Sequence, residues 1–326
     1  MYNSKISGLG MYVPENVVTN DDLSRVMDTS SEWIIERTGI KERRHIKKGD
    51  GNTTATMGVE ASKIAMERAG IDKNEIDLIL FATLSPDYYF PGSGVLVQEL
   101  LDIPTCPAMD IRNQCSGFMY AISTADQFIK SGMYKNILVI GSENHSGGLD
   151  MTTRGRGVSV IFGDGAGAAV ISREDDLTKG ILSSHLHSEG KHAEELALIG
   201  PSTNRWVPEI LDANDPEDIS YYPNMNGQLV FKNAVVRFSE VIMEGLKHNN
   251  FGITVNGKYK ISYAWGIIFS YGLPLTTPDQ IKPNASLGVE LGSAVHSFQI
   301  FVGSYDRISP QSNMTFNTND YRNFDI

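Results

Sequence analysis

The sequence predicts an α/β protein whose sheet is mostly parallel and covered by helices on both faces. Two near-continuous apolar runs, residues 76–84 and 137–142, have the composition of strands that are buried on both sides. Amphipathic segments with a helical period and capping residues alternate with such runs, which is typical of layered α/β folds. The chain of 326 residues is long enough for two units with their own cores or for one large layered domain.

The N-terminal part is expected to begin with a strand at residues 5–13, followed by two short helices. The glycines inside this strand lack the third glycine of a dinucleotide-binding fingerprint, so that type of site is excluded. Thr19 and Ser30 are typical N-cap residues for the two helices. A longer amphipathic helix is expected at residues 53–69, and Gly70 closes it as a C-cap.

The middle of the chain continues this alternation. A helix at residues 94–101 is expected to lead into a short buried strand at 106–111. Two further strands are expected at 158–162 and 166–171, joined as a hairpin by Gly163-Asp164-Gly165. A phosphate-binding loop is the alternative for these glycines, but no Lys-Ser/Thr pair follows them, so the hairpin is favoured.

The pattern divides the chain into two expected domains, residues 1–174 and 175–326. In the second domain a strand is expected at 181–187 and a clear amphipathic helix at 230–246. Three histidines fall at the start of this domain: His185, His187 and His192. No acidic or sulfur ligand is placed to complete a metal site with them, so we expect an exposed strand edge and no metal.

The character of the chain changes after about residue 255. Strand-like pieces occur at residues 260–269 and 297–302, whereas helix caps and long amphipathic periods are missing. The last stretch, residues 309–326, is rich in Ser, Asn, Thr and Asp and is expected to be poorly ordered.

Cys115 is the strongest candidate for a reactive residue, because it lies where the strand at 106–111 runs into a helix that starts at Ser116. Unpaired N–H groups and the helix dipole at such an N-terminus favour a thiolate. The small neighbour Gly117 leaves room for a substrate to approach. The alternative is an ordinary buried thiol that packs as a small hydrophobic residue.

Composition and charge exclude several classes of function. The formal net charge of -11 disfavours nucleic acid as the main partner. No apolar run reaches the about 18 residues of a transmembrane helix, and the start lacks the pattern of a signal peptide, so we expect a cytoplasmic protein without a membrane partner. The two cysteines, Cys106 and Cys115, fit a reducing compartment rather than a disulfide framework.

Positive charge is nevertheless concentrated in one short stretch. Its basic residues are Arg37, Lys41, Arg43, Arg44, Lys47 and Lys48. This charge is sufficient to receive a phosphorylated ligand or an acidic partner. The alternative is a solvated basic face, and charge alone does not decide between the two.

Several motifs in a consistent order resemble those of beta-ketoacyl-acyl-carrier-protein synthase III, a condensing-enzyme family of the thiolase-like superfamily. The resemblance covers residues 1–254. Its motifs are Ser31-Glu32-Trp33-Ile34-Ile35-Glu36-Arg37-Thr38-Gly39-Ile40, Phe90-Pro91, Cys115-Ser116-Gly117-Phe118-Met119-Tyr120-Ala121, Arg156-Gly157, Phe162-Gly163-Asp164-Gly165-Ala166-Gly167, and Met225-Asn226-Gly227 with Val230-Phe231-Lys232. The resemblance implies a homodimer of chains that fold as two similar halves in a duplicated five-layer α-β-α-β-α sandwich.

The resemblance also implies an activity, the initiation of fatty acid synthesis. Cys115 would be the nucleophile that takes an acyl group from acyl-CoA, and malonyl-acyl-carrier-protein would be the partner in a decarboxylative condensation. Acyl-CoA is then a substrate, and no further cofactor and no metal are expected.

Other residues would form the path of the substrate. Trp33 and Arg37 match family positions that hold the adenine end of CoA, and Arg156 and Gly227 match positions along the same tunnel. Phe90 matches a residue at the dimer interface that limits the acyl pocket. Phe231 would line the channel to the nucleophile.

The sequence departs from this family in its last quarter. The family's histidine in a Pro-His-Gln-Ala-Asn motif and its asparagine in a Gly-Asn-Thr motif are missing, so condensation is expected to be slow or absent. Two alternatives therefore stay open. One is a catalytically impaired homologue with a divergent or frame-shifted C-terminus, and the other is an acyltransferase of secondary metabolism.

Overall fold

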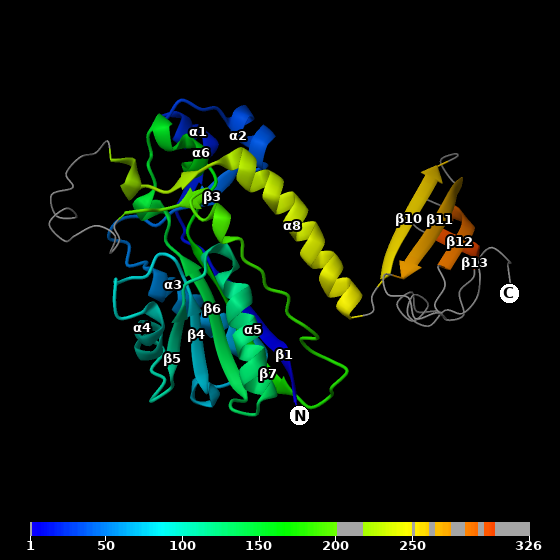
Figure 1. Cartoon of the computed structure of the whole chain (residues 1–326), viewed down its shortest axis with the longest axis horizontal. Helices are drawn as coiled ribbons and strands as arrows, with labels where there is room; N and C mark the ends of the chain where they lie inside the picture. Colours follow the sequence, from blue (N-terminus) through cyan, green and yellow to red (C-terminus); the bar gives the residue numbers. More distant parts are fainter. Residues whose placement is uncertain are drawn as a thin grey trace. The chain divides into compact units, whose positions relative to one another are not determined.

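The computed structural model describes residues 2–200, 218–249, 252–260, 265–274, 284–292 and 297–303 (Figure 1). The chain divides into two compact units. The first holds Met1–Leu182 and Leu186–Asn233, and the second holds Ser183–His185 and Ala234–Ile326. The expected domain boundary at residue 174 coincides with the end of a strand and stays a prediction.

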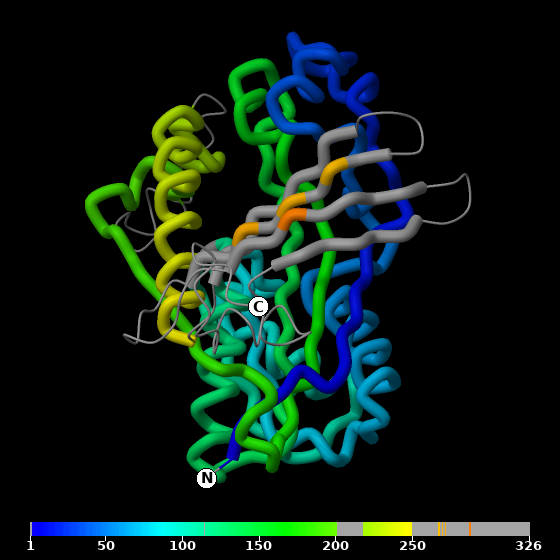
Figure 2. Tube along the Cα trace, turned by 90° about the vertical axis from the view of Figure 1, so that its right-hand side faces the viewer, coloured from blue at the N-terminus to red at the C-terminus, as the bar shows by residue number. Residues whose placement is uncertain are grey.

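The first unit is built on a five-stranded sheet in the order β1-β7-β6-β4-β5. Its strands are β1 (Asn3–Tyr12), β4 (Leu78–Ala82), β5 (Ala108–Ile111), β6 (Asn136–Glu143) and β7 (Gly165–Glu174). Strand β4 runs parallel to β5 and β6, whereas β7 runs antiparallel to β1 and β6. Figure 2 shows β1, in blue, beside the green β7, although more than 150 residues separate them in the sequence.

The sheet is therefore mixed, and the expectation of a mostly parallel sheet is wrong for its β1-β7-β6 part. The segment between β6 and β7 holds only short helical turns, the longest being α6 (Arg156–Ser159). A parallel neighbour would need a crossover of a dozen or more residues that is usually a full helix. Such a helix, α5 (Gly117–Lys130), does connect β5 to β6.

Helices cover both faces of this sheet, as expected. On one face α3 (Thr54–Ala69) and α4 (Ser93–Leu100) pack in a core that includes Ile79 and Phe81 of β4. On the other face α5 packs in a second core that includes Leu78 and Leu80 of the same strand. This alternation along β4 follows from the two-residue period of a strand and explains why the whole run is apolar.

The expected capping residues are confirmed. Thr19 and Ser30 accept backbone N–H groups at the starts of α1 (Asn20–Ser24) and α2 (Ser31–Thr38). Thr53, which the sequence places inside α3, is instead its N-cap. Gly70 ends α3 in the left-handed conformation, with φ of 65°. Gly10 in β1 allows α3 to approach closely, because a Cβ there would lie 2.0 Å from the carbonyl oxygen of Ala61.

Three expected strands differ in the structure. Residues 158–162 are not a strand, because α6 and a turn occupy them, so Gly163-Asp164-Gly165 is not a hairpin. Residues 181–187 form no strand and share one backbone hydrogen bond with β1, from Ile181 N to Ser4 O (2.8 Å). The strand at 106–111 is confirmed as β5, but it is an edge strand with Met109 40% exposed.

Short strands complete the first unit. They form two pairs, β2 (Val17–Thr19) with β3 (Glu42–Arg44) and β8 (Leu196–Ala197) with β9 (Asn224–Met225). The expected helix at 230–246 is confirmed as α8 (Gly227–His248), which starts in the first unit and continues into the second. None of the described helices combines the length and the apolar content needed to cross a bilayer.

The second unit contains an antiparallel four-stranded meander in the described residues. Its strands are β10 (Gly252–Lys260), β11 (Trp265–Pro274), β12 (Asn284–Gly292) and β13 (Ser297–Gly303), paired in chain order. The strand expected at 297–302 is confirmed, whereas the one expected at 260–269 combines the end of β10 with half of β11. The described part of this unit therefore differs from a second mixed half-sandwich, and residues 309–326 lie outside the described residues.

Candidate functional site

Cys115 lies at the junction between strand and helix that the sequence predicts. It is the middle residue of a short 3-10 turn, Gln114–Ser116, between β5 and α5. Its side chain is exposed, so the alternative of an ordinary buried thiol is wrong. Gly117 is buried, and a Cβ there would lie 3.3 Å from the Cβ of Ala82, so α5 begins directly against the end of β4.

The other cysteine has a different environment. Cys106 is partly buried beside the first core, and burial together with the nearby Asp77 raises the pKa of its thiol to about 11. A thiol of this pKa is almost entirely protonated at neutral pH and is a poor nucleophile. Of the two cysteines, only Cys115 therefore combines exposure with a position at a helix start.

Trp33, Arg37 and Arg156 lie together, as the resemblance implies. The guanidinium carbon of Arg37 lies 4.5 Å from the centroid of the Trp33 ring, and that of Arg156 lies 4.7 Å from it. Arg156 also donates to the carbonyl oxygen of Asp28 (2.5 Å), which ties α6 to the loop before α2. Two cations beside one indole ring form a surface that suits a planar, anionic ligand.

The basic stretch has two kinds of residue. Arg43 is buried and donates to Asn20 Oδ1 and to the carbonyl oxygen of Val160 (both 2.8 Å), so it holds β3 in place and is not available to a ligand. Burial also lowers the pKa of Arg43. The remaining exposed cations are Arg37, Lys41, Lys47 and Lys48.

The other matched residues lie on separate elements. Phe90 is 83% exposed in the loop before α4, where Tyr89 is 73% exposed. Phe231 is 69% exposed on α8, which begins at Gly227. The structure thus brings Trp33 together with its two arginines, and the roles of all the matched residues stay predictions.

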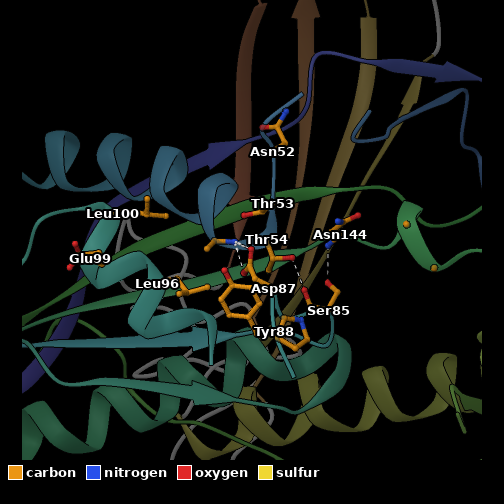
Figure 3. Close-up of a pocket in the computed structure, with 14 residues that line it drawn as sticks. Asn52, Thr53, Thr54, Ser85, Asp87, Tyr88, Leu96, Glu99, Leu100 and Asn144 are labelled. Carbon is orange, nitrogen blue, oxygen red and sulfur yellow. Dashed lines mark hydrogen bonds between the residues drawn. The ribbon is translucent and has the colours of Figure 1, made fainter. Parts of the chain in front are cut away.

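A cavity of about 640 Å³ lies where α3, α4 and the loops after β4 and β6 meet (Figure 3). Asp87 accepts from Ala55 N (3.0 Å) and from Ser93 Oγ (2.7 Å) in its wall. Ser85 Oγ donates to Glu143 (2.6 Å) and accepts from Asn144 N (2.8 Å). No motif of the sequence predicts this cavity, and Cys115 is not among its lining residues.

Asp164 is a second feature that sequence reasoning missed. Its buried carboxylate accepts from Ile46 N (2.6 Å), Ser146 N (2.8 Å) and Ser146 Oγ. It therefore fastens the loop after β3 and the loop after β6 to the start of β7. The unusual Gly163-Asp164-Gly165 sequence was the available signal, but it suggested a turn and not an anchor.

Comparison with known proteins identifies the larger part of the chain. Residues 109–190 match the family model of 3-oxoacyl-acyl-carrier-protein synthase III. The beta-ketoacyl-acyl-carrier-protein synthase III of Aliivibrio fischeri is 47% identical over 246 residues, which are 76% of this chain and 72% of that protein.

Two solved structures are similar in fold. The 3-oxoacyl-acyl-carrier-protein synthase III of Aquifex aeolicus has a TM-score of 0.65 and 41% identity, covering 75% of this chain and 71% of that one. The priming beta-ketosynthase of the R1128 polyketide biosynthetic pathway has a TM-score of 0.62 and 29% identity, covering 76% and 69%. The thiolase-like fold expected from the sequence is confirmed over this shared part.

The C-terminal part of the chain matches something else. Residues 227–326 match a family described as a membrane bound beta barrel domain. This match begins at α8 and includes β10 to β13. Over 76% of its length, however, the chain is 47% identical to the Aliivibrio fischeri enzyme, and it therefore belongs to the beta-ketoacyl-acyl-carrier-protein synthase III family.

Proposed function

We propose that the first unit is an acyltransferase in which Cys115 accepts an acyl group from acyl-CoA. The observation that carries this proposal is the exposed thiol at the start of α5. The thiolate attacks the thioester carbonyl, the backbone N–H of Cys115 is one donor to the oxyanion, and the CoA thiolate leaves with the electron pair of the broken C–S bond. The product is an acyl thioester on Cys115.

The surface formed by Trp33, Arg37 and Arg156 supports CoA as the acyl donor. An adenine base stacks on an indole ring, and guanidinium groups pair with phosphates. The two guanidinium carbons lie within 4.7 Å of the ring centroid, so one ligand could contact all three side chains. A base that stacks on Trp33 would displace one of the arginines from the ring.

The second half-reaction would be condensation with malonyl-acyl-carrier-protein at the start of fatty acid synthesis. The exposed cations Arg37, Lys41, Lys47 and Lys48 suit an acidic carrier protein. The family's histidine and asparagine motifs are missing from the sequence, and losing one such donor typically costs about 10²-fold or more. We therefore propose that acylation of Cys115 is retained and that condensation is slow.

We also propose that the first unit works as a homodimer in the cytoplasm. In the described residues β5 pairs only with β4, so its other edge is open. Large apolar side chains are exposed on β5 and on the neighbouring α4, namely Met109 (40%) and Leu100 (52%), and Phe90 (83%) is exposed in the loop before α4. A second copy would cover both the open edge and these side chains. Two free cysteines fit a reducing compartment.

The test of acyl transfer is intact-mass spectrometry of the full chain after incubation with acetyl-CoA. A mass increase of one acetyl group is expected in the wild type and in Cys106→Ala, and none in Cys115→Ala. Malonyl-acyl-carrier-protein is then added, and release of the acetyl group as a condensed product is expected to be slow. Absence of the adduct from the wild type would refute acyl transfer, and rapid condensation would refute the impaired second step.

A second function is proposed for the C-terminal unit, namely association with a membrane. The observation that favours it is that β10 to β13 form an all-antiparallel meander. Membrane barrels like those of the matched family are built from antiparallel strands, whereas a condensing enzyme would have a mixed second sheet. The test is flotation of the full chain with phosphatidylcholine vesicles in a density gradient. A chain that stays in the lipid-free fractions would refute this second function.

A further inference from the structure

The meander β10 to β13 places residues of opposite character on its two faces. Residues two apart in a strand share a face, and the register shows which residues of neighbouring strands lie together. Phe269 pairs with Gly257 of β10 and Leu287 of β12, and Leu287 pairs with Val302 of β13. This row defines one face of the sheet, named here the apolar face.

The apolar face is continuous over all four strands. On β11 it holds Trp265, Ile267, Phe269, Tyr271 and Leu273. The residues on the same face of the other strands are aliphatic or aromatic, apart from a single glycine. No charged residue and no Ser, Thr, Asn or Gln of the four described strands lies on it.

The opposite face carries all the charged residues of these strands. Lys260 pairs with Gly266, which pairs with Glu290, and Lys258 lies two residues before Lys260 on the same face. Small and polar residues, such as Ser270 and Gly272 on β11, occupy the remaining positions apart from Ile268, Pro274 and Phe301. A sheet that is apolar on one face and small or polar on the other has the alternation of a barrel wall between lipid and a wet interior.

Three side chains of the apolar face are exposed among those whose burial the structure describes. Ile267 is 38% exposed, Phe269 is 46% exposed and Leu287 is 64% exposed. These three lie in adjacent register positions on β11 and β12, so they form one surface. A contiguous exposed apolar surface typically marks a site of interaction with an apolar partner.

Strand length agrees with a lipid bilayer as this partner but does not identify it, because β1 and β7 of the first unit also have 10 residues each. Strands β10, β11 and β12 have 9, 10 and 9 residues, and the outer strand β13 has 7. A tilted strand of about 9 to 11 residues crosses the hydrocarbon core of a bilayer, whereas strands in globular proteins are usually about 5 to 6 residues long. Aromatic residues at Trp265 and Tyr271 lie toward the two ends of the apolar row on β11, where interfacial aromatic residues are common.

We propose that the apolar face of β10 to β13 inserts among the acyl chains of a lipid bilayer, an inference that rests on the proposed membrane association of the second unit. Unpaired backbone groups at an open strand edge are costly in hydrocarbon. The outer strands β10 and β13 each have one partner in the described residues, so insertion requires further strands at both edges. A second copy of the chain would bring the total from four to eight strands, the smallest number in known membrane barrels.

The test compares lysine substitutions at neighbouring positions on the two faces. Phe269→Lys places a charge on the apolar face, and Ser270→Lys places the same charge one residue further on the opposite face. Leu287→Lys and Ser286→Lys form a second matched pair on β12. Each full-length variant is mixed with phosphatidylcholine vesicles and floated, and its Cys115 acylation is measured in parallel to check that the first unit is intact.

The expected result is that the wild type, Ser270→Lys and Ser286→Lys float with the vesicles. Phe269→Lys and Leu287→Lys are expected to lower the floated fraction at least tenfold while leaving Cys115 acylation unchanged. If the wild type floats but the two faces respond equally to lysine, the apolar face is not the lipid contact, although membrane association stands. If the wild type does not float, membrane association itself fails, and the apolar face is covered by protein instead.

Discussion

Replacing Asp164 by asparagine tests whether its carboxylate anchors the loops around the start of β7. The carboxylate is buried, and Ile46 N and Ser146 Oγ donate to one oxygen while Ser146 N donates to the other. An amide can keep its oxygen toward the first pair, but its NH2 group then faces the N–H of Ser146. The variant loses one hydrogen bond to a charged acceptor, which costs about 1.5–3 kcal/mol of stability. It also leaves two buried donors facing each other, which costs about a further 1–3 kcal/mol.

We therefore expect Asp164→Asn to lower the free energy of unfolding of the first unit by about 3 kcal/mol or more. The assay is urea unfolding of the full chain, followed by the near-ultraviolet circular dichroism of its aromatic residues. Asp175→Asn is the matched control, because Asp175 is 77% exposed and pairs only with Arg173 in the described structure. A loss below about 1 kcal/mol in Asp164→Asn, or an equal loss in the control, would refute the anchoring role.

Three further outcomes are expected. Trp33→Ala should raise the KM for acetyl-CoA about tenfold with little change in the acylation rate at saturation, because base stacking is worth about 1–3 kcal/mol. Trp33→Phe should restore most of the affinity, and an unchanged KM in Trp33→Ala would contradict the assigned CoA surface. Iodoacetamide at pH 8 should label Cys115 well before Cys106, since the pKa of Cys106 is about 11 and its thiol ionises only as the pH rises toward that value. Peptide mass mapping measures the two labelling rates, and equal rates would contradict this expectation. Gly10→Ala should destabilise the first unit by about 2 kcal/mol, because the new Cβ would lie 2.0 Å from Ala61 O. In Gly167→Ala the new Cβ would have no atom within 4 Å, so the thermal unfolding temperature of this control should stay near that of the wild type.

The sequence predicts well those parts of the fold that depend on local signals. Thr53 and Gly70 mark the ends of α3, and the apolar spacing between them marks the face that packs on the sheet. The position of Cys115 at the end of β5 also follows from local patterns, because a short strand and a helix meet there.

Features that depend on distant partners could not be predicted in this way. Residues 158–162 are apolar enough for a strand, but Val158 and Val160 are buried within α6 and the turn after it. Whether β7 runs parallel or antiparallel is decided by its pairing with β1, which lies more than 150 residues earlier in the chain. The role of Asp164 likewise depends on donors from two other loops.

The expectation of no membrane partner stays a prediction, and it rests on counting apolar runs. A search for runs of about 18 apolar residues finds helices that span a membrane, but it does not find strands whose apolar residues alternate with polar ones. Strand β11 has this alternation in part, with Phe269 and Tyr271 flanking Ser270. The pairing of β11 with β10 and β12 makes the pattern evident, because it shows which residues of the neighbouring strands lie on the same face as Phe269 and Tyr271.

The exposure of Cys115 has a consequence for handling the protein. An accessible thiol reacts with peroxide to a sulfenic acid, which condenses with a second thiol or oxidises further to irreversible acids. The chain has one other cysteine, and Cys106 is partly buried with a pKa of about 11, so it is a poor resolving thiol. Oxidised Cys115 will therefore be restored by an added reductant rather than by the protein itself, and a preparation stored without one will lose the sulfur on which acyl transfer depends.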